Sequence, residues 1–148
     1  MSREVKMVRY DDLKKKWTER AGPGSKTAST MYVGGVPPAI NWNRGEGIDC
    51  DSCSAGTVLV PVGNVQRMHR HPIDEIYIVM RGQAGFRSDD GKELYGGPLT
   101  CFFAPSNVFH GIRNVGLEEL MTVWFQPGQI TMDQIEFYPD EKEATHGT

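Results

Sequence analysis

The feature that most restricts the fold of this chain is a series of short β-like segments separated by turn residues. The 148 residues include 17 Gly and 9 Pro, so turns are frequent and long helices are not expected. An Asp-Gly pair within residues 88–92 predicts a hairpin turn. The segments with strand-like composition are residues 30–33, 57–60, 75–80, 98–104, 109–114, 120–126 and 130–137. Short strands at this spacing predict an all-β sandwich or barrel.

Chain length and charge set the number of domains and narrow the range of functions. With 148 residues, of which 39% are hydrophobic, the chain suits a single domain with one core over residues 1–148. The net charge of −3 and the scattered basic residues argue against nucleic acid as a partner. No apolar run approaches the roughly 18 residues of a membrane span, and the first residues do not resemble a signal peptide. We therefore expect a cytoplasmic protein with no membrane contact.

The two ends of the chain are expected to lie outside the barrel core. A narrow apolar stripe with helical spacing is formed by Tyr10, Leu13 and Trp17. Asp11 is a candidate cap for this helix, so residues 1–28 predict a short N-terminal helix and an extension that covers the domain. Residues 138–148 are polar and are expected to form a flexible tail, in which His146 is solvated.

A candidate metal site lies within residues 63–82. In an extended chain, side chains two residues apart point to the same side, so His69 and His71 project together. Glu75 has the same parity and adds a carboxylate. Two imidazoles and one carboxylate make up most of a transition-metal site. The fourth candidate ligand is His110, which comes from a different strand-like segment, as a site built across a barrel requires.

The first of these two segments resembles the first signature motif of the cupin superfamily. That motif consists of a glycine, five residues, His-x-His, three residues, a glutamate, six residues and a glycine. All its defined positions are present here as Gly63, His69, His71, Glu75 and Gly82.

The second segment is similar to the second cupin motif, which usually runs glycine, five residues, Pro-x-Gly, two residues, histidine, three residues and asparagine. Pro105, His110 and Asn114 match this motif in register. Asn107 stands where the second glycine is usual, which is a mild change because asparagine tolerates a left-handed turn. Leu99 stands at the first glycine position and suggests a slightly altered loop.

The resemblance covers residues 57–126 and implies an all-β fold, the cupin jelly-roll β-barrel. It also implies that one divalent metal ion, of Fe, Mn, Zn or Ni, is bound by His69, His71, Glu75 and His110. Four protein ligands leave two positions of a six-coordinate ion for substrate or water, which is typical of a catalytic site. By analogy with the family, we expect a homodimer that pairs through its sheet edges.

The function implied by the resemblance is that of an enzyme acting on a small oxygen-containing organic molecule. Among the reactions that small cupins catalyse, we expect dioxygenase chemistry for this chain. A lyase, decarboxylase, isomerase or polyketide cyclase remains open, because one fold hosts many chemistries. A non-catalytic cupin that binds a small ligand is the alternative from a different class.

Parity suggests further residues that line the site. Arg67 shares the face of His69 and His71, so it is a candidate for positioning an anionic substrate. Tyr77 shares the face of Glu75 and is a candidate acid or base. Either face of residues 120–126 could point inward. Apolar walls for a pocket are suggested by Phe102, Phe103 and Phe109.

The three cysteines do not predict a disulfide framework. Cys50 and Cys53 form a C-x-x-C pair, which is a weak signal because redox motifs of this form open a helix after a strand. No second cysteine pair completes a zinc site. Cys101 is expected to be a small buried apolar residue.

Overall fold

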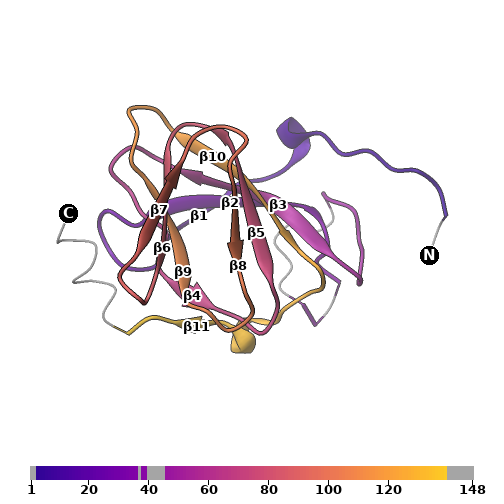
Figure 1. The fold of residues 1–148 in the computed structure, drawn as a ribbon. Helices are drawn as coiled ribbons and strands as arrows, with labels where there is room; N and C mark the ends of the chain where they lie inside the picture. The colour runs from indigo at the N-terminus through magenta and orange to yellow at the C-terminus, as the bar shows by residue number, and fades with distance from the viewer. Residues whose placement is uncertain (1–2, 37, 40–45, 140–148) are drawn as a thin grey trace.

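The computed structural model describes residues 3–36, 38–39 and 46–139 and contains two antiparallel β-sheets that enclose a common core (Figure 1). The six-stranded sheet contains, in spatial order, β1 (Lys16–Glu19), β2 (Lys26–Val33), β3 (Ser54–Val60), β10 (Leu120–Gln126), β5 (Glu75–Arg81) and β8 (Cys101–Ala104). The five-stranded sheet contains, in spatial order, β11 (Glu136–Phe137), β4 (His69–Arg70), β9 (His110–Asn114), β6 (Ala84–Ser88) and β7 (Glu93–Gly96). This is the all-β jelly-roll architecture that the sequence predicted.

Alternation along β10 settles which of its faces points inward. The buried side chains of this strand are Leu120, Thr122, Trp124 and Gln126. The intervening residues are more exposed, as expected for a strand with one face on the core. β10 lies between β3 and β5, so its buried face joins the centre of the six-stranded sheet to the core.

The core is continuous between the two sheets. Its most buried members come from the six-stranded sheet (Val60, Val79, Leu120) and from the five-stranded sheet (Ala84, Ile112). This apolar contact excludes water from the inner faces and holds the two sheets together.

One glycine is required by this packing. Gly56 in β3 lies against β2, and a Cβ atom there would collide with the backbone carbonyl of Thr30 and the ring of Trp124.

The N-terminal prediction was wrong in its secondary structure. The helical segment is only a 3-10 turn, η1 (Tyr10–Asp12), and Trp17 lies in β1, paired with Ala28 of β2. Strand pairing to β2 supplies backbone hydrogen bonds that an isolated helix of this length cannot match. Trp17 is also covered by Lys26, whose ammonium lies 5.0 Å from the ring centroid.

The C-terminal segment was also predicted with too much strand. Within residues 130–137 the chain forms a 3-10 turn, η2 (Met132–Gln134), followed by the two-residue strand β11. The side chain of Gln134 accepts a hydrogen bond from the Thr131 N–H at 2.9 Å, which favours the turn at this point. His146 and most of the predicted tail lie outside the described residues.

The predicted hairpin is confirmed, because β6 and β7 pair antiparallel around the Asp-Gly turn.

The prediction for Cys101 was wrong. Cys101 is exposed, because the edge strand β8 directs Phe102 inward and the residues on either side of it outward. No helix in the described part of the chain has the length and apolar character to cross a membrane.

Candidate metal centre

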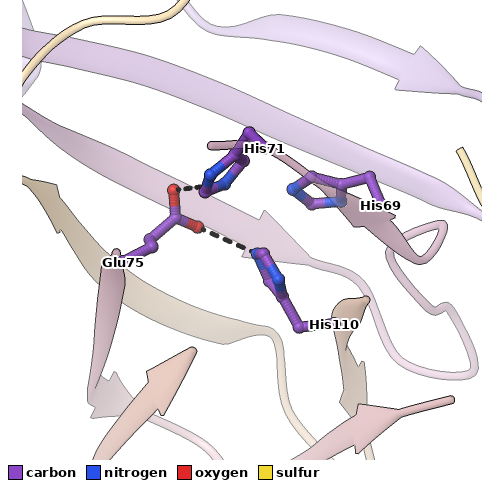
Figure 2. A group of neighbouring side chains, drawn as sticks. All are labelled: His69, His71, Glu75 and His110. Carbon is purple, nitrogen blue, oxygen red and sulfur yellow. Dashed lines mark ion pairs between the residues drawn. The ribbon is translucent and has the colours of Figure 1, made fainter. Parts of the chain in front are cut away.

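Four side chains from both sheets converge on one point inside the barrel (Figure 2). His69 in β4 is the cross-strand partner of His110 in β9, and both belong to the five-stranded sheet. Glu75 begins β5 of the opposite sheet, and His71 lies in the link between β4 and β5. The potential ligand atoms of these four residues all lie within 4.8 Å of one another.

The backbone orients all three imidazole rings. Each Nδ1 lies within hydrogen-bond distance of a carbonyl two residues away along the chain. His69 Nδ1 lies 3.0 Å from Arg67 O, His71 Nδ1 lies 3.0 Å from Ile73 O, and His110 Nδ1 lies 2.9 Å from Val108 O. Because a carbonyl can only accept, the proton of each neutral ring resides on Nδ1 and the lone pair on Nε2.

The Nε2 lone pairs point at a carboxylate. Nε2 of His71 lies 3.3 Å from Glu75 Oε2, and Nε2 of His110 lies 3.5 Å from Glu75 Oε1 (Figure 2). Both Nε2 atoms are buried and lack a hydrogen-bond partner. Lone pairs facing carboxylate oxygens repel unless a cation lies among them, so this donor set fits a divalent metal ion.

The charges of the cluster are also arranged for a cation. Burial alone would raise the pKa of Glu75, but the neighbouring His110 and His71 rings outweigh it and hold that pKa well below its usual value. Burial, aided by repulsion from His110, lowers the pKa of His69 to about 3. Burial opposes the charged form of His71, but the neighbouring Glu75 outweighs it and raises the pKa. The site therefore keeps a carboxylate and a neutral His69 ring at neutral pH.

Sequence reasoning missed the residue that holds Glu75 in place. Gln126 in β10 donates a hydrogen bond from Nε2 to Glu75 Oε2, and its Oε1 accepts one from Ser54 Oγ at 3.2 Å. Gln126 and Ser54 are both buried. The signal for Gln126 was present in the alternation of β10, but the inward face could not be chosen from the sequence.

His69, His71 and Glu75 form one wall of a cavity of about 110 Å³. Its apolar wall is formed by Met31, Val58, Trp124, Ile130 and Ile135. Three amide side chains line the cavity as well, namely Gln66, Gln126 and Gln129.

The expectation that Phe102, Phe103 and Phe109 form the apolar wall of this cavity was wrong, because none of them is among the residues that line it. Phe102 and Phe109 are buried elsewhere, and Phe103 points outward from β8.

Tyr77 lies beside the cluster, in the cavity wall, and is only 2% exposed. Its ring is edge-on to His110, with a centroid distance of 6.0 Å. Burial, together with the charge and hydrogen bonding of Glu75, raises the pKa of Tyr77 well above its usual value. The phenol therefore holds its proton at neutral pH.

Arg67 lines a second cavity of about 100 Å³, next to the first. The two cavities share Ser29, Gln66, His69 and Ile135 as wall residues. Arg67 donates to the Arg20 carbonyl at 3.0 Å, while its Nε is buried without a hydrogen bond. Arg20, which sequence reasoning missed, lies on the same cavity, and both guanidinium groups pack on the ring of Phe137. Burial and the charge of Arg67 lower the pKa of Arg20.

The turn before β8 and the loop between β8 and β9 each contain one residue in the left-handed backbone region. Leu99 and Asn107 are the two non-glycine residues with positive φ in the described part of the chain, at 71° and 63°. They occupy the two positions at which the second cupin motif usually has glycine. The Asn107 N–H donates to the His71 carbonyl at 2.8 Å, so this loop also supports a residue of the first segment.

The comparisons with known proteins agree with this geometry. Residues 56–126 match the family model described as Cupin domain. The dimethylsulfoniopropionate lyase DddQ of Ruegeria pomeroyi is 35% identical over 63 residues, which are 43% of this chain and 31% of that protein. The crystal structure of DddQ from R. pomeroyi superimposes with a TM-score of 0.61 at 23% identity, covering 78% of this chain and 56% of that one.

A Thermotoga maritima structure, described as a predicted oxalate decarboxylase, superimposes with a TM-score of 0.64 at 17% identity, covering 83% of this chain and 99% of that one. The present chain thus spans about a third of the curated DddQ sequence and about half of its crystallised chain. The matched residues, the jelly-roll fold and the two motifs agree. Residues 56–126 thus form a cupin domain, and the His/Glu cluster could hold a metal ion.

Proposed function

We propose that this protein is a metal-dependent lyase that acts on a small carboxylate-containing molecule. The observation that carries the proposal is the cluster of imidazoles whose Nδ1 atoms are tied to carbonyls and whose Nε2 atoms converge on Glu75. The local identity to a dimethylsulfoniopropionate lyase favours non-oxidative bond cleavage over the dioxygenase chemistry preferred from the sequence.

His69, His71, Glu75 and His110 would hold one ion of Fe, Mn, Zn or Ni. When bound, a divalent ion supplies Lewis acidity toward a carboxylate or carbonyl oxygen of the substrate. The amide side chains of the cavity provide donors and acceptors for the rest of a small polar molecule. The apolar side chains of the cavity exclude water from the bound molecule.

Tyr77 is proposed as the residue that transfers a proton. Its hydroxyl carries the proton in the resting site, because burial and Glu75 keep its pKa high. A phenol in this state can protonate a substrate carbon or leaving group as negative charge develops there. Glu75 and Gln66 line the same cavity as Tyr77 and are the polar neighbours that influence its hydroxyl.

Arg67 is proposed to position the substrate carboxylate from the second cavity, together with Arg20. The described residues that line this cavity include neither Asp nor Glu, and its hydroxyl-bearing residues are Thr18, Ser25, Thr27 and Ser29. Arg67→Met should raise KM for a carboxylate substrate and leave the metal content unchanged, whereas loss of metal would show that Arg67 supports the cluster instead.

The test of the proposal begins with metal analysis of the protein purified without added metal. The stripped protein is then reloaded with Mn²⁺, Fe²⁺ or Zn²⁺ and assayed with dimethylsulfoniopropionate and with oxalate, in air and without oxygen. Metal-dependent cleavage that is equal under both conditions supports a lyase. A reaction that consumes oxygen would establish a dioxygenase, and binding without turnover would favour a ligand-binding cupin. His69→Ala serves as the control for metal-dependent signal.

The predicted homodimer and the cytoplasmic location remain proposals. The strand β8 is an open edge of the six-stranded sheet, and Phe103 on it is 58% exposed. Light scattering after size-exclusion chromatography, for the protein and for Phe103→Ser, tests whether two copies pair along this edge.

A further inference from the structure

The C-x-x-C pair lies immediately before β3 and is not part of the site described above. The Cys50 and Cys53 sulfur atoms are 3.8 Å apart, and neither cysteine is in a disulfide. Both side chains are only half-buried, so small reagents can reach them. The two sulfurs need to close to about 2.0 Å to form a bond.

The cysteine pair is connected to the metal cavity by two short hydrogen-bonded paths. Ser54 follows Cys53 directly and donates to Gln126, which in turn donates to Glu75. The carbonyl of Cys50 accepts a hydrogen bond from Gln129 Nε2 at 2.6 Å, and Gln129 also accepts one from the Val36 N–H. Both Ser54 and Gln129 line the cavity.

We propose that Cys50 and Cys53 form a thiol–disulfide site that takes a small disulfide as its oxidant and changes the metal affinity of the cavity. The Cys50 thiolate attacks one sulfur of the oxidant, forms a mixed disulfide and releases one thiolate, which takes up a proton. The Cys53 thiolate then attacks the Cys50 sulfur and releases the second half of the oxidant. In total, two protein thiols lose two electrons and two protons, and the small disulfide becomes two thiols.

The local environments of the two cysteines suit these separate roles. Cys50 Sγ lies 3.3 Å from Ser52 Oγ, and this contact lowers the pKa of the Cys50 thiol. Burial raises the pKa of Cys53, which is consistent with its acting second. Formation of the bond draws Cys53 toward Cys50 and therefore displaces Ser54 from Gln126, so we expect Glu75 to be less well oriented.

The first experiment equilibrates the full chain with reduced and oxidised glutathione at a series of ratios. A Cys101→Ser background removes the exposed third thiol, and mass spectrometry after alkylation reads which cysteines remain free. The expected result is a monomer in which Cys50 and Cys53 lose reactivity together with a mass decrease of two hydrogens. Two free thiols at the most oxidising ratio, or a stable glutathione adduct on Cys50, would overturn the proposal.

The second experiment measures Mn²⁺ affinity of the reduced and oxidised forms, because soft thiolates bind this hard ion poorly. We expect the oxidised form to bind Mn²⁺ at least about threefold more weakly. The double variant Cys50→Ser with Cys53→Ser should show one affinity regardless of oxidant. Equal affinities of the two forms would reject the coupling to the cavity. Absence of Mn²⁺ binding in both forms would count against the metal centre and leave the glutathione result as the test of the disulfide.

Discussion

The segment around His69 and the segment around His110 present their imidazoles in the same way but build their turns differently. In the first segment, the turn positions with positive φ are the glycines Gly63 and Gly82, at 77° and 90°. In the second, Leu99 and Asn107 adopt the same backbone region. Because each imidazole is oriented by a backbone carbonyl close in sequence, the ring position depends on the path of the backbone and not on which residue makes the turn.

Glu75 differs from the histidines in this respect. Its orientation depends on a side chain from another strand, Gln126, in addition to the neighbouring rings. A substitution outside the two motifs can therefore disturb the carboxylate more easily than the imidazoles. The orientation of each imidazole is therefore set within its own segment, whereas the orientation of the carboxylate depends on a contact that only the tertiary structure supplies.

The largest effect is expected when either segment loses its imidazole. His69→Ala and His110→Ala should each weaken metal binding by more than about 100-fold, which exceeds the usual effect of changing a group that only supports a ligand. Calorimetric titration of the stripped protein with Zn²⁺ measures this. Arg70→Ala is the matched control, since Arg70 lies between the two histidines of the first segment but pairs with Glu136 on the surface. Retained affinity in either histidine variant would remove that residue from the proposed ligand set.

A smaller effect is expected from the residue that orients the carboxylate. Gln126→Leu keeps the approximate size of the side chain but removes its hydrogen bond to Glu75, and we expect roughly 10- to 100-fold weaker metal binding. Phe125→Ala is the control, because the neighbouring side chain points outward. An unchanged affinity for Gln126→Leu would mean that the histidines alone orient Glu75.

The sequence predicted those parts of the molecule that depend on residues close together in the chain. The His69–Glu75 spacing and the Asp-Gly hairpin are local patterns, and the structure brings the four proposed ligands together. Trp17 was misplaced because pairing with β2 outweighs a helical stripe of three residues. Arg20 and Gln126 were missed because only the tertiary fold brings them to the cavities.

A third prediction concerns the end of the second segment. Asn114 is buried and donates to the carbonyls of Val60 and Glu118, while its Oδ1 accepts from the Gly116 N–H at 2.9 Å. Asn114→Ala removes all three hydrogen bonds and leaves the buried Val60 carbonyl without this donor, so we expect a loss of about 2 kcal/mol in the free energy of unfolding. Urea denaturation measures this loss. If metal affinity fell while stability did not, Asn114 would act on the site and not on the turn.

The smallest expected effect concerns the turn residues themselves. A non-glycine residue in the left-handed region costs roughly 1–2 kcal/mol, and the extra flexibility of glycine in the unfolded chain returns about 0.5–1 kcal/mol of that cost. Leu99 is 82% exposed, so little burial is lost when its side chain is removed. Leu99→Gly should therefore raise the free energy of unfolding by up to about 1 kcal/mol.

Asn107→Gly is the matched comparison for Leu99→Gly, because asparagine tolerates positive φ and should gain almost nothing. Both variants are measured by urea denaturation, and both should bind metal as the parent protein does. A loss of stability in Leu99→Gly would mean that the leucine side chain makes a contribution larger than its backbone strain. Leucine would then stand at this usual glycine position because its side chain stabilises the fold, and not merely because the fold tolerates it.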